Sequence, residues 1–164
     1  MIKKMTPQII LLVALFGFGM SANAILLELT PGSTDGKDAQ ISNGSTSGYN
    51  YGTYSGVILN WVGDLRSIGL IEFDLSVIPG NATINSAELS LFQKYNTNQN
   101  SYIYDLFRVT SSWDESTVTF NSRPSLDPTA VASLLIPDGN RNLYRNSEDI
   151  TSLVSGWIDG TYDN

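Results

Sequence analysis

The chain has 164 residues, which is enough for one domain with a hydrophobic core. Hydrophobic residues make up 41% of it and charged residues only 15%, a balance that excludes a disordered chain. Acidic residues outnumber basic ones by 16 to 9, and a net charge of −7 argues against nucleic-acid binding. The absence of histidine and cysteine excludes thiol nucleophiles, disulfides and histidine-based triads. A binding function is therefore expected before an enzymatic one.

Residues 1–24 have the three parts of a secretory signal peptide. Lys3 and Lys4 give a positive start, residues 9–18 form an apolar run, and Ala22-Asn23-Ala24 fits the small-residue cleavage pattern. The apolar run is shorter than the ~20 residues that a membrane-spanning helix needs, although an uncleaved anchor remains the alternative. We predict a secreted or cell-surface protein with no membrane span in the mature chain, residues 25–164.

The mature part has the pattern of short strands joined by polar turns. Three stretches alternate between apolar and polar residues, as strands with one buried face do, although Asp105 interrupts the third. Shorter candidate strands are residues 39–42, 57–62, 117–120 and 130–136. The apolar faces of the three alternating stretches are Ile71, Phe73 and Leu75; Ala87, Leu89 and Leu91; and Ile103, Phe107 and Val109.

One helix is predicted near the C-terminus. Apolar residues recur there at the helical spacing i, i+3, i+4 and i+7, with Asp149 or Thr151 as the N-cap and Gly160 beyond the end. Many short strands with no helices between them exclude a parallel α/β fold and predict an all-β, antiparallel jelly-roll β-sandwich. The apolar helix residues are Ile150, Leu153, Val154 and Trp157.

Three ordered groups of motifs resemble a known family. The first is Asp38-Ala39-Gln40-Ile41 followed by Asn50-Tyr51-Gly52, and the second runs from Leu70-Ile71-Glu72-Phe73-Asp74-Leu75-Ser76 to Ser86-Ala87-Glu88-Leu89. The third joins residues 108–110 and 113–121 to Asp149-Ile150-Thr151 and Trp157. Together they resemble the DNRLRE domain, also classified as carbohydrate-binding module family 96.

The resemblance implies a secreted jelly-roll sandwich that binds polysaccharide. In this family a basic residue often stands where the chain has Glu72, and members usually continue past the tryptophan-containing helix with a further turn and a final strand. The chain is therefore expected to be incomplete at its C-terminus. Its expected partner is an extracellular polysaccharide, acidic or neutral.

Acidic loops give the chain a candidate calcium site. Calcium prefers carboxylate, amide and carbonyl oxygens, and Asp35, Asp38 and Asn43 supply these in one short stretch. The stretch does not match an EF-hand loop, so ordinary turns ordered by Asp and Asn are the alternative. A structural calcium ion is the cofactor that the sequence suggests.

Paired carboxylates give no credible catalytic site. Asp114-Glu115 and Glu148-Asp149 are adjacent residues, and neighbours on a strand point to opposite faces, whereas glycosidase carboxylates face each other across a cleft. Asp114 is better explained as ordering a turn. We predict that the chain is not an enzyme.

Exposed aromatic residues are the candidate sugar-binding groups, because aromatic rings stack on the apolar face of a pyranose. Trp113 and Trp157 have apolar neighbours and are expected in the core. One candidate cluster is Tyr49, Tyr51 and Tyr54, and the other is Tyr144 with Arg141 and Arg145 on one face of the sandwich, where the arginines suit an acidic glycan.

The predicted function is that of a secreted, non-catalytic polysaccharide-binding module. One alternative is a structural cell-surface or matrix protein that uses the same sandwich for adhesion. Another is the binding module of a polysaccharide lyase whose catalytic part lies outside this chain.

Overall fold

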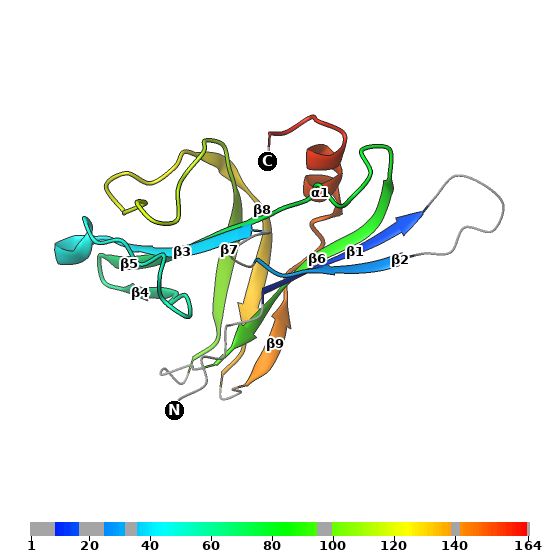
Figure 1. Cartoon of the computed structure of the whole chain (residues 1–164). Helices are drawn as coiled ribbons and strands as arrows, with labels where there is room; N and C mark the ends of the chain where they lie inside the picture. Colours follow the sequence, from blue (N-terminus) through cyan, green and yellow to red (C-terminus); the bar gives the residue numbers. More distant parts are fainter. Residues whose placement is uncertain (1–8, 17–24, 32–35, 95–99, 139–141, 164) are drawn as a thin grey trace, which may run out of the picture.

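The computed structural model describes residues 9–16, 25–31, 36–94, 100–138 and 142–163 of the chain (Figure 1). These residues form nine strands, one α-helix and a 3₁₀ turn over Gly44–Thr46. The strands are β1 (Ile9–Phe16), β2 (Ile25–Leu29), β3 (Gly36–Ser42), β4 (Asn60–Val62), β5 (Leu65–Phe73), β6 (Thr83–Gln93), β7 (Tyr102–Val109), β8 (Leu126–Ile136) and β9 (Leu143–Asn146), and the helix is α1 (Thr151–Ile158).

The paired strands run antiparallel and form three sheets. Their orders are β2-β1-β6-β9, β3-β5-β4 and β7-β8, and a bridge between Leu134 and Ser147 joins the first sheet to the third. In Figure 1 the β3-β5-β4 sheet extends to one side of β7 and β8, and β1 and β2 extend to the other. The prediction of an antiparallel all-β fold with one short helix near the C-terminus is confirmed; the jelly-roll arrangement stays a prediction.

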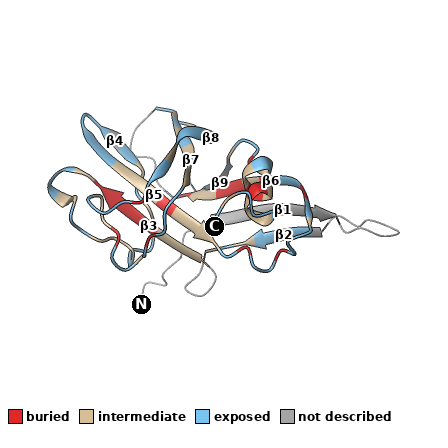
Figure 2. Cartoon of the chain, turned by 90° about the horizontal axis from the view of Figure 1, so that it is seen from above, coloured by how far each residue is buried: buried red, intermediate tan, exposed pale blue. Residues whose placement is uncertain are grey.

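The core consists of two clusters of buried apolar side chains, and Figure 2 shows buried stretches in β3 and around β6. Strand β5 contributes to both clusters, because Leu70 belongs to the second whereas Ile71 and Phe73 pack against the first. The first cluster contains Leu75, Ile78, Ile84, Ala87, Leu89, Ala132, Ile150 and Val154, and the second contains Ala39, Ile41, Leu70, Trp113 and Val118.

The predicted helix and two of the alternating faces are confirmed. The β5 and β6 faces and the helix residues all lie in or against the first cluster, as their periodicity predicts. Helix α1 begins at Thr151 and its N-cap is Ile150, so the predicted N-cap at Asp149 or Thr151 is wrong. The backbone N–H of Thr151 still donates to the Asp149 carboxylate over 2.8 Å. None of the described residues forms a helix long and apolar enough to cross a membrane.

Two strand predictions need correction. Of the predicted β7 face, Ile103 and Phe107 are 69% and 42% exposed, and the more buried side of the strand carries Leu106 instead. Asp105 lies between them on the same face, and its charged side chain indicates that this face points to solvent. Val109, beyond an irregularity in the strand pairing, packs against the second core cluster as predicted. Residues 117–120 form no strand, because the Asp114 carbonyl accepts the N–H of Val118 over 2.8 Å and closes a turn. Strands β1, β2 and β9 were not predicted.

Strand β1 lies in the middle of the largest sheet, although its residues belong to the predicted signal peptide. It pairs with β2 on one side and β6 on the other, so that Leu11 is opposite both Leu29 and Leu89. The folded chain therefore uses this apolar segment as a strand. Cleavage after Ala24 stays a prediction about how the chain is processed.

Candidate functional site

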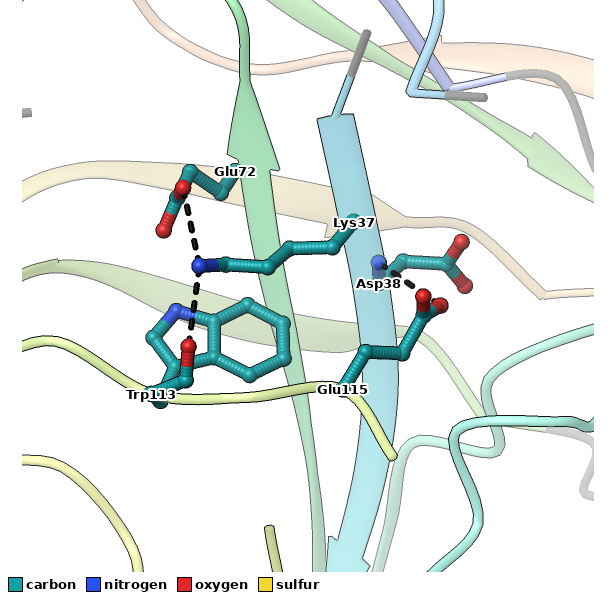
Figure 3. A network of polar contacts seen from close by, with 5 residues as sticks. All are labelled: Lys37, Asp38, Glu72, Trp113 and Glu115. Carbon is teal, nitrogen blue, oxygen red and sulfur yellow. Dashed lines mark hydrogen bonds and ion pairs between the residues drawn. The ribbon is translucent and has the colours of Figure 1, made fainter. Parts of the chain in front are cut away.

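A lysine and a tryptophan hold the loop after β7 against the β3-β5-β4 sheet (Figure 3). Lys37 and Glu72 are cross-strand partners on β3 and β5, and their side chains form a 2.9 Å ion pair. The same ammonium donates to the backbone carbonyl of Trp113 over 2.9 Å and lies 4.9 Å from the centre of its ring. The acidic residue at position 72 thus neutralises Lys37, and the group is a structural anchor.

The Asn50-Tyr51-Gly52 turn packs tightly on the loop that carries Glu115. The Asn50 amide donates to the carbonyls of Glu115 and Val118 over 2.8 and 2.7 Å. A Cβ at Gly52 would lie 2.0 Å from the Glu115 carbonyl oxygen, so the close approach requires glycine. This family-like motif therefore fixes the polar loop between β3 and β4.

The three predicted calcium ligands are not brought together by the described structure. Asp38 lies inside β3, whereas Asn43 follows its end and is about 16 Å away at strand spacing. The Asn43 amide is already engaged, because its oxygen accepts the N–H of Arg66 and its nitrogen donates to the carbonyl of Asp64. Asp35 lies outside the described residues. The structure describes no group of three or more acidic residues that could hold a metal ion.

Asp38 instead lies close to a second carboxylate. Its backbone N–H donates to Glu115 Oε1 over 3.3 Å, and both side chains lie on the same side of β3 in Figure 3. Burial, and secondly the negative charge of Glu115, raise the pKa of Asp38 above its ordinary value of 3.8. The two carboxylates are neighbours rather than groups that face each other across a substrate cleft.

The tyrosine loop, defined as Tyr49, Tyr51 and Tyr54, is partly assembled. Tyr51 and Tyr54 contact each other edge to face with ring centres 5.1 Å apart. Tyr49 and Tyr54 are 62% and 60% exposed. The loop thus presents aromatic surface to solvent, as expected.

Tyr144 and Arg145 do not share a face. They are consecutive on β9, so their side chains leave the sheet in opposite directions. Arg145 is on the inner side, where its Nε donates to Gln93 Oε1 over 2.8 Å. Arg141 lies outside the described residues. The prediction that Tyr144 and Arg145 lie on one face is therefore wrong, for a reason that strand geometry alone supplies.

Tyr144 belongs to a different group, which we call the β6–β9 outer face: Glu88, Ser90, Phe92, Tyr144 and Asn146. Two pairs in it are cross-strand partners, Phe92 with Tyr144 and Ser90 with Asn146. The two rings contact each other with centres 5.2 Å apart, and Tyr144 remains 42% exposed.

Polar groups continue this outer face along the strands. Ser90 donates to Asn146 Oδ1 over 2.8 Å, and Asn146 Nδ2 donates to Glu88 Oε1 over 2.7 Å. Ser90 itself is buried, so the groups open to solvent are the Asn146 amide and the Glu88 carboxylate. An aromatic ring near an amide and a carboxylate can stack on a sugar ring while these groups form hydrogen bonds with its hydroxyls. Alternation along β6 supports the positions of Glu88 and Ser90, but the pairing with β9 has no signal in the sequence.

A shallow cavity of about 240 Å³ lies between β8 and α1. Arg108 is in it, bound to Asp127 over 3.1 Å and stacked under the ring of Tyr162 at 4.3 Å. The same ring packs on Gly156, where a Cβ would lie 2.5 Å from it. Because Arg108 and Tyr162 are occupied with each other, the cavity lacks the free ring that sugar stacking needs. Its lining residues are Arg108, Asp127, Thr129, Val131, Asp149, Ile150, Ser152, Leu153 and Tyr162.

Comparison with known proteins identifies a family. The model of carbohydrate-binding module family 96 matches residues 31–163, which include the tyrosine loop and the whole β6–β9 outer face. No curated protein and no solved structure matches the chain. The resemblance expected from the ordered motifs is confirmed.

Proposed function

Because the chain belongs to carbohydrate-binding module family 96, we propose that it is a secreted, non-catalytic module that binds an extracellular polysaccharide. The family match over residues 31–163 is the observation that carries this proposal. The signal-like segment at residues 1–24 supports export. An exported protein would reach the compartment in which extracellular polysaccharides occur.

We place the principal contact at the β6–β9 outer face. Tyr144 is held by Phe92 on paired strands, and sites on strands are positioned more rigidly than sites on loops. The exposed Asn146 and the half-buried Glu88 supply amide and carboxylate groups near the ring, and the buried Ser90 holds Asn146 in place. Tyr51 and Tyr54 contact each other in the same edge-to-face way, but they lie in a loop and not on paired strands.

Binding by such a face should be weak, with Kd values of roughly micromolar to millimolar. A shallow site buries little area, and the sugar hydroxyls exchange water for protein partners at almost equal free energy. The net charge of −7 further weakens the long-range attraction of acidic polymers. A neutral glycan therefore suits the outer face, whose one charged member is Glu88.

Affinity electrophoresis of the exported protein through gels that contain single polysaccharides, neutral and acidic, tests the function. We expect retardation by at least one neutral polysaccharide, with little dependence on salt. The same mixtures, assayed for reducing ends and unsaturated sugars, should release neither. Product release would contradict the non-catalytic assignment, whereas no retardation in any gel would favour a structural matrix protein.

A further inference from the structure

Strand β1 is an inner strand of the β2-β1-β6-β9 sheet, so its removal would leave β2 without its partner and one edge of β6 open. It pairs with β6 over eight residues, from Ile9 opposite Leu91 to Phe16 opposite Thr83, and with β2 over five. If residues 1–24 are cleaved, as their signal-like sequence predicts, the whole of β1 is lost. The β6 edge between Thr83 and Leu91 then exposes unpaired backbone groups.

This edge also borders the main core. Ala87 and Leu89 of β6 are 3% and 8% exposed in the intact sheet, and both belong to the first core cluster. An open strand edge next to buried apolar residues favours the addition of another strand. The pairing of β1 shows the geometry that fits there: an extended segment antiparallel to β6.

Strand β2 loses its partner at the same time. Among the described residues it pairs with β1 alone, at one end of the sheet. Its side chains alternate between the core and solvent. Leu27 and Leu29 pack against the first cluster. Leu26 is 66% exposed, and Glu28 is also exposed. After cleavage it would form the new N-terminus, a short apolar strand with nothing to pair with.

Strand direction decides where this segment can go. Because β1 is antiparallel to both neighbours, β2 and β6 run parallel to each other. If β2 moved sideways within its own chain it would make a parallel pair with β6, which is less stable per residue than an antiparallel one. A second copy of the chain can approach in the reverse direction and present its β2 antiparallel to β6.

We propose that the processed protein is a dimer in which the two copies exchange β2, each Ile25–Leu29 segment pairing antiparallel with β6 of the other copy. The exchange is reciprocal, so it closes a twofold dimer rather than a fibre. Leu27 and Leu29 of each copy then cover Ala87 and Leu89 of its partner. This inference rests on the proposed cleavage after Ala24 but not on polysaccharide binding, which is measured separately on the same sample.

The test uses residues 1–164, exported from a secreting host. Mass spectrometry should show Ile25 as the N-terminus, and size-exclusion chromatography with light scattering should give twice the mass of one processed chain. Recovery of a processed monomer, or of exported protein that keeps residues 1–24, would overturn the proposal.

Two variants and a peptide identify the strand. Leu27→Lys places a charge at the inward position and should convert the dimer to monomer, whereas the matched control Leu26→Lys, at an exposed position, should remain dimeric. A synthetic peptide of residues 9–16 with flanking lysines should compete for β6 and also release monomer. If Leu27→Lys cannot be obtained as a folded protein, the peptide experiment alone tests whether β2 pairs with β6 of the other copy. A dimer that resists the peptide would overturn the exchange.

Discussion

Five aspartates in this domain each accept a hydrogen bond from the backbone N–H two residues further along the chain. The donor is the backbone N–H of a serine or threonine in every case, and the distance from its nitrogen to the aspartate Oδ1 is between 2.8 and 3.2 Å. At four of them the hydroxyl of the same serine or threonine also hydrogen-bonds to the carboxyl and is the main reason that its pKa lies below the ordinary value of 3.8, and the backbone bond adds to this effect. At Asp127 the backbone bond from Thr129 lowers the pKa most, followed by the bond from Arg108. The role of these carboxylates is therefore to order turns. From the amino-acid composition alone they could equally have been metal ligands or catalytic groups. The five are Asp74, Asp114, Asp127, Asp149 and Asp159.

Asp149 has the clearest consequence for stability, because it orders the start of α1. Asp149→Ala should lower the Tm by a few degrees at pH 7, whereas Asp149→Asn, which keeps an acceptor oxygen, should recover most of the loss. The folded-state pKa of the carboxyl is lowered, so its ionised form stabilises the fold above pH 3.8 and this contribution disappears as the pH falls below that value.

Thermal unfolding of the three proteins between pH 7 and pH 3 tests this prediction. The curves of wild type and Asp149→Ala should converge as the pH falls. A difference that stays constant over the range would show that the carboxylate charge has no part in the effect.

Asp38 should behave in the opposite way. Its pKa is raised, first by burial and then by Glu115, so the folded state holds its proton more strongly than the unfolded state does. The ionised form therefore destabilises the fold at pH 7, and stability is regained as the pH falls through the raised pKa toward 3.8. Asp38→Asn is expected to raise the Tm by a few degrees at pH 7 and to have little effect near pH 3.5.

The same variant examines the calcium prediction. Measured in chelator and again in millimolar calcium, Asp38→Asn should remain the more stable protein if no ion binds there. A bound ion would stabilise wild type alone by RT ln(1 + [L]/Kd), and the order of the two melting temperatures would reverse. Such a reversal would establish Asp38 as a calcium ligand.

At the scale of the elements, strand β8 shows how sharply the two faces of a strand differ. Leu134 is fully buried in the middle of the domain, and its neighbour Leu135 is 54% exposed opposite Ile103. Leu134→Ala should lower the free energy of unfolding by about 2–5 kcal/mol, because it leaves a cavity that cannot collapse fully. Leu135→Ala should change it by less than about 0.5 kcal/mol.

Chemical denaturation of both variants measures the difference. The m-values should match that of wild type, so that the change is in stability and not in the compactness of either state. Equal losses at the two positions would mean that the exposed face of β7 and β8 is covered in solution.

Periodicity predicted the elements whose apolar face is unambiguous. The alternation around Phe73 and Leu89 and the helical spacing from Ile150 each identified residues of the first core cluster. In β7 periodicity does not identify the buried face, because both faces carry apolar or aromatic residues. One face has Ile103 and Phe107, and the other has Tyr104 and Leu106. The buried face follows from packing against other strands, which periodicity does not report.

The candidate site was only half predictable for a similar reason. Tyr144 could be chosen as an aromatic residue between polar neighbours, but its partners Phe92 and Asn146 come from the register of β6 against β9. Register depends on long-range pairing between segments more than 50 residues apart. The separation of Tyr144 from Arg145 needed only the assignment of a strand there.

At the scale of the whole molecule, the acidic residues that the structure describes are mostly occupied in the fold. Glu72 neutralises Lys37, Asp127 binds Arg108, and Glu148 accepts the N–H of Ser133. Among the described residues, the exposed aromatic side chains lie on the tyrosine loop (Tyr49 and Tyr54), on the β6–β9 outer face (Tyr144) and on β7 (Phe107). The central claim is that the second of these binds a polysaccharide.

Calorimetric titration measures this claim directly. The ligand is an oligosaccharide prepared from the polysaccharide that retards the protein most strongly. Tyr144→Ala should raise the Kd at least about tenfold, corresponding to ~1.4 kcal/mol, because it removes the stacking ring. Tyr54→Ala, on the separate tyrosine loop, should leave the Kd within about twofold, and both variants should keep the wild-type Tm. An unchanged Kd for Tyr144→Ala together with a large loss for Tyr54→Ala would contradict the account and place the glycan on the tyrosine loop.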